Sequence, residues 1–263
     1  MTTSAKRMTP FDVSIVGGIP FQVTDLKRAS QWLIHDASPR HLAVNIRLAN
    51  AYNVALAADD DSYRNVLVEQ GINFPDGKPV VWFMNRRVPS NGRARRVRGP
   101  SLFQAAMSEG VAAETRHFLL GSTPETLSSL VRVLTERFAG VVIAGSYSPP
   151  FAPLDDAYLD DCTRRIADAR ADIVWVALGT PKQDVLGTAL APRVGLPTVN
   201  VGAAFDFMAG TVREAPPWVQ ESGFEWFYRM MTEPRRLWRR YIFGNAKFLR
   251  AALRNSRPLR VSK

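Results

Sequence analysis

The sequence predicts an α/β fold of Rossmann-like type, with a mostly parallel sheet and a C-terminal helical appendage. Short apolar runs alternate with amphipathic stretches of helix length over about residues 10–210, which is the pattern of β-α-β units. After Gly210 the composition changes, and prolines, aromatic residues and a basic run follow. We therefore expect an α/β domain over residues 1–210 and a basic helical appendage over residues 211–263.

Five apolar runs are expected to form the strands, and two longer stretches are expected to form helices between them. The strands are residues 41–46 (HLAVNI), 116–120 (RHFLL), 141–145 (VVIAG), 172–178 (DIVWVAL) and 198–201 (TVNV). One helix is expected over residues 124–138, after the cap candidates Ser122 and Thr123, because its apolar positions recur at helical spacing. The other covers residues 155–169, with acids early and arginines late, as the helix dipole favours.

The net charge of +10 is concentrated in the appendage. Residues 235–263 contain ten Lys or Arg and no Asp or Glu, so the remaining 24 Lys and Arg balance 24 Asp and Glu. Such a surface fits nucleic acid, anionic lipid or a pyrophosphate group. We expect a helical appendage with breaks near Pro234 and Gly244, and its mixture of arginines and aromatic residues favours a membrane surface.

The composition fits a cytoplasmic chain with a full core, since 46% of its 263 residues are hydrophobic. The single Cys162 and three histidines give neither an internal disulfide nor a Cys/His metal cluster. No stretch has the apolar length of a membrane span or the form of a signal peptide. The acidic residues 59–61 resemble an Asp-x-Asp metal site, but they follow an Ala-rich stretch and are interpreted as a solvated helix end.

Candidate chemistry lies in loops that follow predicted strands or open helices, at the edge where open α/β sheets bind ligands. In residues 74–79 (FPDGKP), Asp76 is a carboxylate able to accept a proton from an acceptor hydroxyl, although Asp-Gly is also an ordinary turn. Residues 121–124 (GSTP) open a helix, and their amide groups suit a phosphate or ribose. They lack the dinucleotide fingerprint and the P-loop lysine, which argues against NAD and ATP.

Two further loops each supply one polar residue. Gln183, in residues 178–183 (LGTPKQ), offers a donor and an acceptor to a sugar hydroxyl or nucleobase edge, or serves as a structural amide. Asp206, in residues 200–207 (NVGAAFDF), is a single acid among apolar residues. It either meets ribose hydroxyls or caps a loop.

Taken together, these segments resemble the WecG/TagA/CpsF family of bacterial glycosyltransferases. The resemblance covers roughly residues 40–250. It rests on FPDGKPVVW, RVRGPSLF, HFLLGSTPET, GSYSPPF, DIVWVALGTPKQD and the long segment from VGAAFDFMAG to GNAKFL. Within the family, the chain looks closest to the β-1,4-glucosyltransferases that extend a polyprenyl-diphosphate-linked glucose in xanthan-like exopolysaccharide synthesis.

The resemblance implies an inverting transfer, without metal or cofactor, from a UDP-sugar to a polyprenyl-diphosphate-linked sugar at the inner face of the cell membrane. It assigns Asp76 as the general base and Asp206 to the nucleoside. It also places Gln183, Asn45 and Arg96 in the donor pocket. The appendage arginines expected to contact the diphosphate are Arg229, Arg236 and Arg239.

Two departures from the family pattern bear on the donor sugar. A Thr-x-Asn pattern becomes AVN at residues 43–45, so Ala43 replaces a hydroxyl, and Gly-x-Asp-Leu becomes GPSL at residues 99–102, so Ser101 replaces an acid. We expect both changes near the sugar pocket, where a missing partner for an N-acetyl group shifts selectivity. The resulting prediction is UDP-glucose rather than UDP-N-acetylmannosamine.

Three alternatives stay open at this point. They are a UDP-N-acetylmannosamine transferase of teichoic acid or enterobacterial-antigen type, a nucleic-acid-binding protein that uses the basic tail, and a sugar-nucleotide-binding module without catalysis. We expect no nucleic-acid partner, because that function leaves the strand-end loops without a role. A homo-oligomer is compatible with the sequence.

Overall fold

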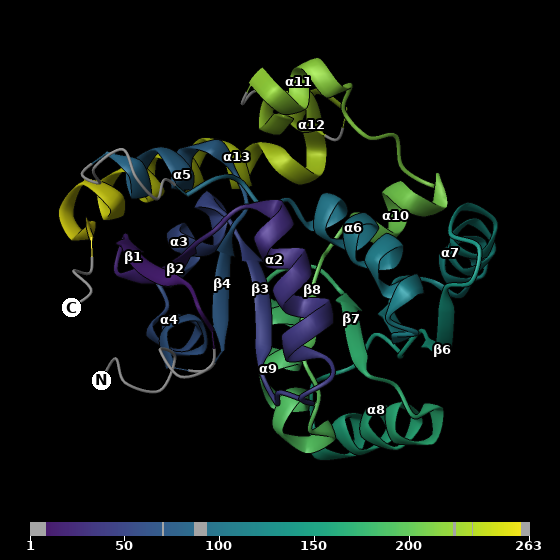
Figure 1. Ribbon diagram of the computed structural model, residues 1–263. Helices are drawn as coiled ribbons and strands as arrows, with labels where there is room; N and C mark the ends of the chain where they lie inside the picture. Colours follow the sequence, from purple (N-terminus) through teal and green to yellow (C-terminus); the bar gives the residue numbers. More distant parts are fainter. Residues whose placement is uncertain (1–8, 70, 87–93, 223–224, 233, 259–263) are drawn as a thin grey trace.

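The computed structural model describes residues 9–69, 71–86, 94–222, 225–232 and 234–258, and for residues 221, 225, 226, 229, 232, 234–243, 257 and 258 it gives the backbone alone. Six parallel strands form the central sheet, in the order β4-β3-β8-β7-β5-β6 (Figure 1). Their bounds are β3 Asn45–Ala49, β4 Ile72–Pro75, β5 Arg116–Gly121, β6 Val142–Tyr147, β7 Ile173–Ala177 and β8 Thr198–Asn200. The three-residue strand β8 lies between β3 and β7, so it joins β3 and β4 to the other three strands. The predicted α/β fold with a parallel sheet is confirmed.

Helices cover both faces of this sheet, so its central strands β3 and β7 are buried on both sides. Trp175 of β7 packs into an apolar cluster with the helices on one face, and its neighbours Val174 and Val176 pack into another cluster on the opposite face. The first face carries α2 Leu26–Trp32 with its π-helical extension Leu33–Ala37, α6 Gly99–Ala112, α7 Pro124–Arg137 and α10 Ala204–Ala209. The second face carries α8 Asp156–Ala169 and α9 Lys182–Val194.

A third apolar cluster joins a small antiparallel sheet to the remaining helices. The small sheet has the order β2-β1-β9. Its strands are β1 Asp12–Val16, β2 Ile19–Val23 and β9 Arg257–Pro258, and the helices of this cluster are α3 Ala51–Ala57, α4 Asp61–Glu69 and α5 Lys78–Asn85 together with the end of α13 Pro234–Asn255. Two short helices, α11 Pro217–Ser222 and α12 Glu225–Thr232, precede α13.

The helix boundaries follow the capping residues that the sequence provides. Thr123 caps α7 by accepting a hydrogen bond from the backbone N–H of Thr126 at 3.2 Å, and Asp155 caps α8 by accepting one from Tyr158 at 2.9 Å. Such caps stabilise a helix by about 1 kcal/mol each. Both predicted helices are therefore confirmed to within one residue.

The strand predictions were less accurate near the N-terminus. Only the last two residues of the predicted strand 41–46 belong to β3, which continues to Ala49. The hairpin of β1 and β2 was not predicted, although its two-residue turn is Gly17-Gly18, with φ values of 61° and 83° that suit glycine. Strand β4 was also missed, since only four residues separate Gly71 from Asp76.

The C-terminal segment is helical, as predicted, and a helix begins at Pro234. The expected break at Gly244 is wrong, because α13 runs through it to Asn255. Gly244 is buried next to the Tyr52 ring of α3, and the packing of α13 along α3 holds the helix through the glycine. The division into residues 1–210 and 211–263 stays a prediction.

Candidate active site

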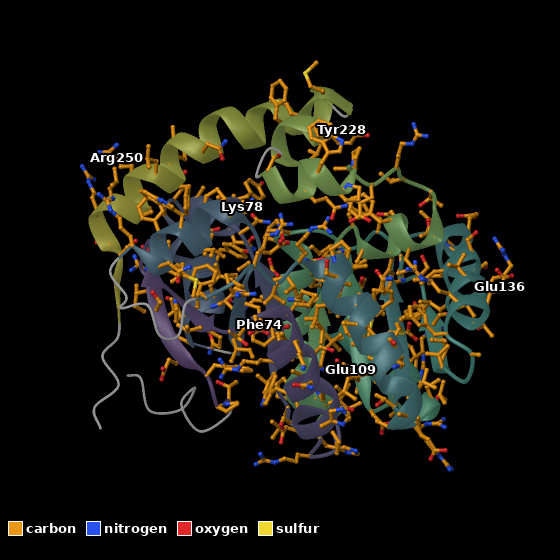
Figure 2. The ribbon with its side chains drawn as sticks, turned by 45° about the horizontal axis from the view of Figure 1, so that its top comes forward. Phe74, Lys78, Glu109, Glu136, Tyr228 and Arg250 are labelled. Atoms are coloured by element: carbon orange, nitrogen blue, oxygen red, sulfur yellow. The ribbon has the colours of Figure 1, made fainter. Side chains whose placement is uncertain are left out.

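The loops that follow the strands of the central sheet meet at its carboxyl edge. Lys78 begins α5 directly after the Asp76-Gly77 turn, and Figure 2 shows it on the side of the molecule that carries α13. Tyr228 of α12 and Arg250 of α13 are labelled toward the two ends of the appendage in the same view. The appendage therefore lies on the same side of the molecule as the loop that follows β4.

Asp76 lies directly after β4 and is half-buried. Its backbone N–H donates to the carbonyl of Ala49 at 2.8 Å, so the pairing with β3 continues to the aspartate itself. Gly77 has a φ of 124°, which glycine adopts without strain, and it turns the chain into α5. The neighbouring strand β3 is followed by Asn50, whose side chain caps α3 by accepting from the Tyr52 N–H at 2.9 Å. A rigid turn therefore fixes the Asp76 carboxylate at this edge.

Asp206 lies in the first turn of α10, after β8, and is half-buried. Its Oδ1 accepts a hydrogen bond from the Ser122 hydroxyl at 3.1 Å. The carbonyl of Ser122 in turn accepts one from the Ser148 hydroxyl at 2.7 Å. These bonds join the loops after β8, β5 and β6, and they hold a partly exposed carboxylate where a ribose can be bound.

Gln183 lies in the first turn of α9 and is only 5% exposed. Its Oε1 accepts a hydrogen bond from the backbone N–H of Gly179 at 3.1 Å, so this atom has the structural role that the sequence analysis gave as the alternative to ligand binding. Within the described part of the chain, its Nε2 has no hydrogen-bond partner. A Cβ on Gly202 would be 3.7 Å from Oε1, so the glutamine also touches the loop after β8.

Two arginines, Arg96 and Arg98, lie in the segment that runs beside the loop of Asp76. The segment before α6 runs along β4, where the Val97 N–H donates to the carbonyl of Pro75 at 2.8 Å. Arg96, one residue earlier, is half-buried. Arg98, one residue later, is buried and donates to Glu214 at 2.6 Å. Cationic groups thus stand beside the end of β4.

Asn45 lies at the opposite end of its strand. It begins β3, four residues before Ala49, or about 13 Å away along an extended chain. It is 3% exposed, and its Nδ2 donates to Thr188 at 2.9 Å while its Oδ1 accepts from Thr198 at 3.1 Å. A place for Asn45 in the donor pocket stays a prediction, but the geometry favours Asn50 for that position.

Ala43 precedes β3 and is exposed at the amino end of the sheet. The expectation that it lies near the sugar pocket stays a prediction, which this distance from the carboxyl edge disfavours. Ser101 is different, because it lies in the first turn of α6, where its hydroxyl is 3.4 Å from Arg98 Nη1. Only one of the two departures is thus close to the carboxyl edge.

A buried polar cluster beneath the edge was missed in the sequence analysis. Asp184, the residue after Gln183, is 1% exposed. It accepts hydrogen bonds from Tyr63 Oη at 2.7 Å, Asn200 Nδ2 at 3.1 Å and Asn53 Nδ2 at 3.3 Å. Burial raises the pKa of its carboxyl, while the Tyr63 hydroxyl and the charge of Arg47 act in the opposite direction.

Arg47 of β3 completes this cluster and is fully buried. It donates to Asn73 Oδ1 at 2.8 Å and to Thr188 Oγ1 at 3.2 Å. Burial lowers the pKa of its guanidinium to about 10, although Asp184 favours the charged form. The available signal was an arginine inside the apolar strand NIRLA, which requires a buried acceptor.

Residues 13–262 match the family described as the glycosyl transferase WecG/TagA/CpsF family. The chain belongs to this family. It is therefore a glycosyltransferase. It is also similar to the N-acetylglucosaminyldiphosphoundecaprenol N-acetyl-beta-D-mannosaminyltransferase of Bacillus subtilis (strain 168), with 28% identity over 233 residues that cover 86% of each chain. The name of this relative gives an N-acetylmannosaminyl donor group, so it favours the alternative donor over glucose.

The remaining sequence predictions concern the periphery of the glycosyltransferase. The side chains of Arg229, Arg236 and Arg239 lie outside the described residues. Asp59 and Asp60 connect α3 to α4, and Asp61 begins α4, so residues 59–61 lie at a helix end as predicted. Asp59 forms an ion pair with Lys247. Among the described residues, no three His, Cys, Asp or Glu side chains gather as a metal site would require, and no helix has both the length and the hydropathy of a membrane span.

Proposed function

We propose that this glycosyltransferase transfers a sugar from a UDP-sugar to a polyprenyl-diphosphate-linked sugar, with inversion at the anomeric carbon. The observation that carries the proposal is the position of Asp76, a partly exposed carboxylate on a rigid turn at the carboxyl edge. The name of the Bacillus subtilis relative, which acts on a diphosphoundecaprenol-linked sugar, supports the class of acceptor.

In the proposed reaction, Asp76 removes the proton from the acceptor hydroxyl as the hydroxyl oxygen attacks C1 of the donor sugar. The bond between C1 and the diphosphate oxygen breaks, and UDP leaves with the electron pair. Cations near the diphosphate stabilise the charge that develops on it. We assign this role to Arg96 and to the appendage arginines Arg229, Arg236 and Arg239.

The donor nucleotide is proposed to bind between the loops after β5, β7 and β8. Asp206 would accept hydrogen bonds from the ribose hydroxyls, and the Nε2 of Gln183 would donate a hydrogen bond to the UDP-sugar. The Phe151 ring is fully exposed on the neighbouring loop, which Lys182 holds by donating to the carbonyl of Ala152 at 2.8 Å. An exposed ring on a fixed loop suits contact with a nucleobase.

For the donor sugar we propose N-acetylmannosamine first and glucose second. The name of the relative supports the former. The latter rests on Ser101, since Ala43 lies at the wrong end of the sheet. The test is a direct competition of UDP-N-acetylmannosamine and UDP-glucose with short-chain polyprenyl-diphosphate N-acetylglucosamine or glucose as acceptor. The proposal would be contradicted if no product formed with either donor on either acceptor. A preference for UDP-glucose would reverse the order of the donors.

A peripheral position on the cytoplasmic face of the membrane is also proposed. Large apolar side chains are exposed on α5, α11, α12 and α13; they are Trp82, Trp218, Phe227, Met231, Leu249 and Leu253. On α13, Leu249 and Leu253 are one turn apart and lie next to exposed Arg250 and Arg254. An apolar stripe beside cations is the pattern of an interfacial helix on anionic lipid.

We predict that the double variant Leu249→Glu, Leu253→Glu loses sedimentation with phosphatidylglycerol-containing vesicles. Burial of apolar surface gives about 25 cal/mol per Å², and two added carboxylates oppose contact with an anionic leaflet. The matched control is Val68→Glu, an exposed apolar position on α4. Point variants are preferred to deletion of residues 235–263, because Phe248 and Ala252 of this segment belong to the core. Unchanged sedimentation of the double variant would contradict the membrane proposal.

A further inference from the structure

The appendage is attached to the α/β unit at both of its ends. At the C-terminal end, Phe248, Ala251 and Ala252 of α13 pack into an apolar cluster. The Phe248 ring lies edge-to-face with that of Phe83 in α5, with 5.6 Å between the centroids. The pairing of β9 with β1 and the Lys247–Asp59 ion pair add polar contacts at this end.

At the N-terminal end, Ala215 and Val219 are buried, and a buried guanidinium binds the same segment. Arg98 is 9% exposed in its side chain, and its Nη2 is 2.6 Å from Glu214 Oε1. Its Nη1 donates to Gln220 Oε1 at 2.7 Å. Glu214 lies between α10 and α11, and Gln220 lies in α11, so both belong to the segment that leads into the appendage. Charge-assisted bonds of this length are about twice as strong as neutral ones.

The backbone around Arg98 touches two loops of the proposed site. The preceding Val97 N–H donates to Pro75, the residue before Asp76, at 2.8 Å. The following Gly99 packs against the Val201 carbonyl so closely that a Cβ there would be 2.9 Å from its oxygen. Val201 leads into the loop of Asp206. Arg98 thus starts from a position fixed by both loops and extends its side chain to the appendage.

We propose that Arg98, Glu214 and Gln220 form a latch that positions the entry of the appendage over Asp76 for binding of the diphosphate-linked acceptor. This inference rests on the proposed function. Arg98 is a positioning residue here, since its guanidinium is occupied by Glu214 and Gln220. Opening the latch lets the appendage entry move relative to Asp76, while the loops that bind the donor keep their own hydrogen bonds. The expected effect falls on the acceptor rather than on the donor.

The first test measures hydrogen exchange of the full-length protein without substrates. The variants are Glu214→Ala, which removes the carboxylate, and Arg98→Lys, which keeps the charge but loses the fork that reaches two acceptors. Amide exchange over residues 211–222 should accelerate about tenfold in both, because the helix that begins at Pro217 loses its anchor. Residues 244–255 should keep their protection. The matched control is Glu136→Gln, which breaks the exposed Arg132–Glu136 pair.

The second test measures transfer with the donor and the lipid-linked acceptor varied separately. In Glu214→Ala, the KM for the acceptor should rise about tenfold, whereas kcat and the KM for the donor should stay within about twofold. A merely structural contact would lower thermal stability without this split between substrates. Unchanged protection over residues 211–222, or an acceptor KM that stays the same or falls, would overturn the latch. Wild-type protein that transfers no sugar would overturn the proposed function instead, and the exchange experiment would still decide whether Arg98 holds the segment.

Discussion

Asp76 and Asp184 are two acids that the fold brings to the same edge of the sheet, yet they have different surroundings. Asp76 follows β4 on a glycine turn and is half-buried. Asp184 follows β7 in the first turn of α9, is 1% exposed and accepts hydrogen bonds from Tyr63, Asn53 and Asn200. An acid enclosed by donors holds structure together, whereas an acid open to solvent can take a proton from a substrate. The comparison predicts that one is needed for folding and the other for the reaction.

The largest effect is expected for Asp184→Ala, which should lower the free energy of unfolding by about 3–5 kcal/mol. The substitution leaves the buried charge of Arg47 without its nearby acid and leaves Tyr63 without an acceptor. Urea unfolding followed by tryptophan fluorescence measures the change. The control is Asp160→Ala, an exposed acid paired with Arg193. A loss below about 1 kcal/mol would show that Asp184 is not structural and would break the comparison.

Asp76→Asn should instead lower turnover by about 10²-fold or more, which corresponds to about 2.7 kcal/mol in the activation free energy. The unfolding free energy should change by less than about 0.5 kcal/mol, because the turn depends on the backbone and on Gly77. Transfer assays and the same urea series give both numbers. An unchanged rate in a folded variant would remove Asp76 from the mechanism.

Another buried group, His117, makes the stability of the folded protein depend on pH. Burial lowers its pKa to about 3 from the ordinary 6.5, and Trp175 Nε1 donates to its Nδ1 at 3.1 Å, so the folded protein holds it neutral. Between these two pKa values the unfolded chain binds the extra proton, so stability is lost as pH falls below 6.5. From pH 7 to pH 5 this amounts to about 2 kcal/mol.

The raised pKa of Asp184 acts with the opposite sign, because the folded protein takes up that proton more readily as pH falls. His117→Asn removes the histidine contribution and leaves that of Asp184. Urea unfolding of wild type and variant at pH 7 and pH 5 should therefore show a smaller loss in the variant. Equal losses would show that His117 does not titrate on unfolding.

The smallest effect is expected for Tyr63→Phe, at about 1.5 kcal/mol, because Asp184 loses one hydrogen bond but keeps those from Asn53 and Asn200. The position is buried, and phenylalanine fills the same space. Chemical unfolding measures the difference, with Tyr52→Phe on the neighbouring helix as a control. A loss as large as that of Asp184→Ala would mean that the hydroxyl, rather than the carboxylate, organises the cluster.

The sequence analysis placed Gln183 and Asp206 at one edge because parallel strands end together, and it singled out Asp76 by its Asp-Gly turn although strand β4 was not predicted. It missed Asp184 and Arg98 because their partners are far away in the chain. Asp184 and Tyr63 are 121 residues apart, and Arg98 and Glu214 are 116 residues apart. No local pattern reports such pairs.

The errors in secondary structure have a similar origin. Strand β3 continues to Ala49 across an arginine because Asn73 and Thr188 accept its hydrogen bonds. The helix at Gly244 continues because α3 packs against it. Local propensity opposed both outcomes, and tertiary contacts decided them.

The three residues of β8 have a consequence for synthesis of the chain on the ribosome. Strands β3 and β4 are complete by residue 75, and β5, β6 and β7 by residue 177. Within the part of the chain that the structure describes, no strand pairing connects the two groups until residues 198–200 are added. A nascent chain that stops earlier exposes two long strand edges, one on β3 and one on β7, which are ready to pair with other chains. Translation pauses before residue 198 should therefore be the moment at which this protein most needs a chaperone.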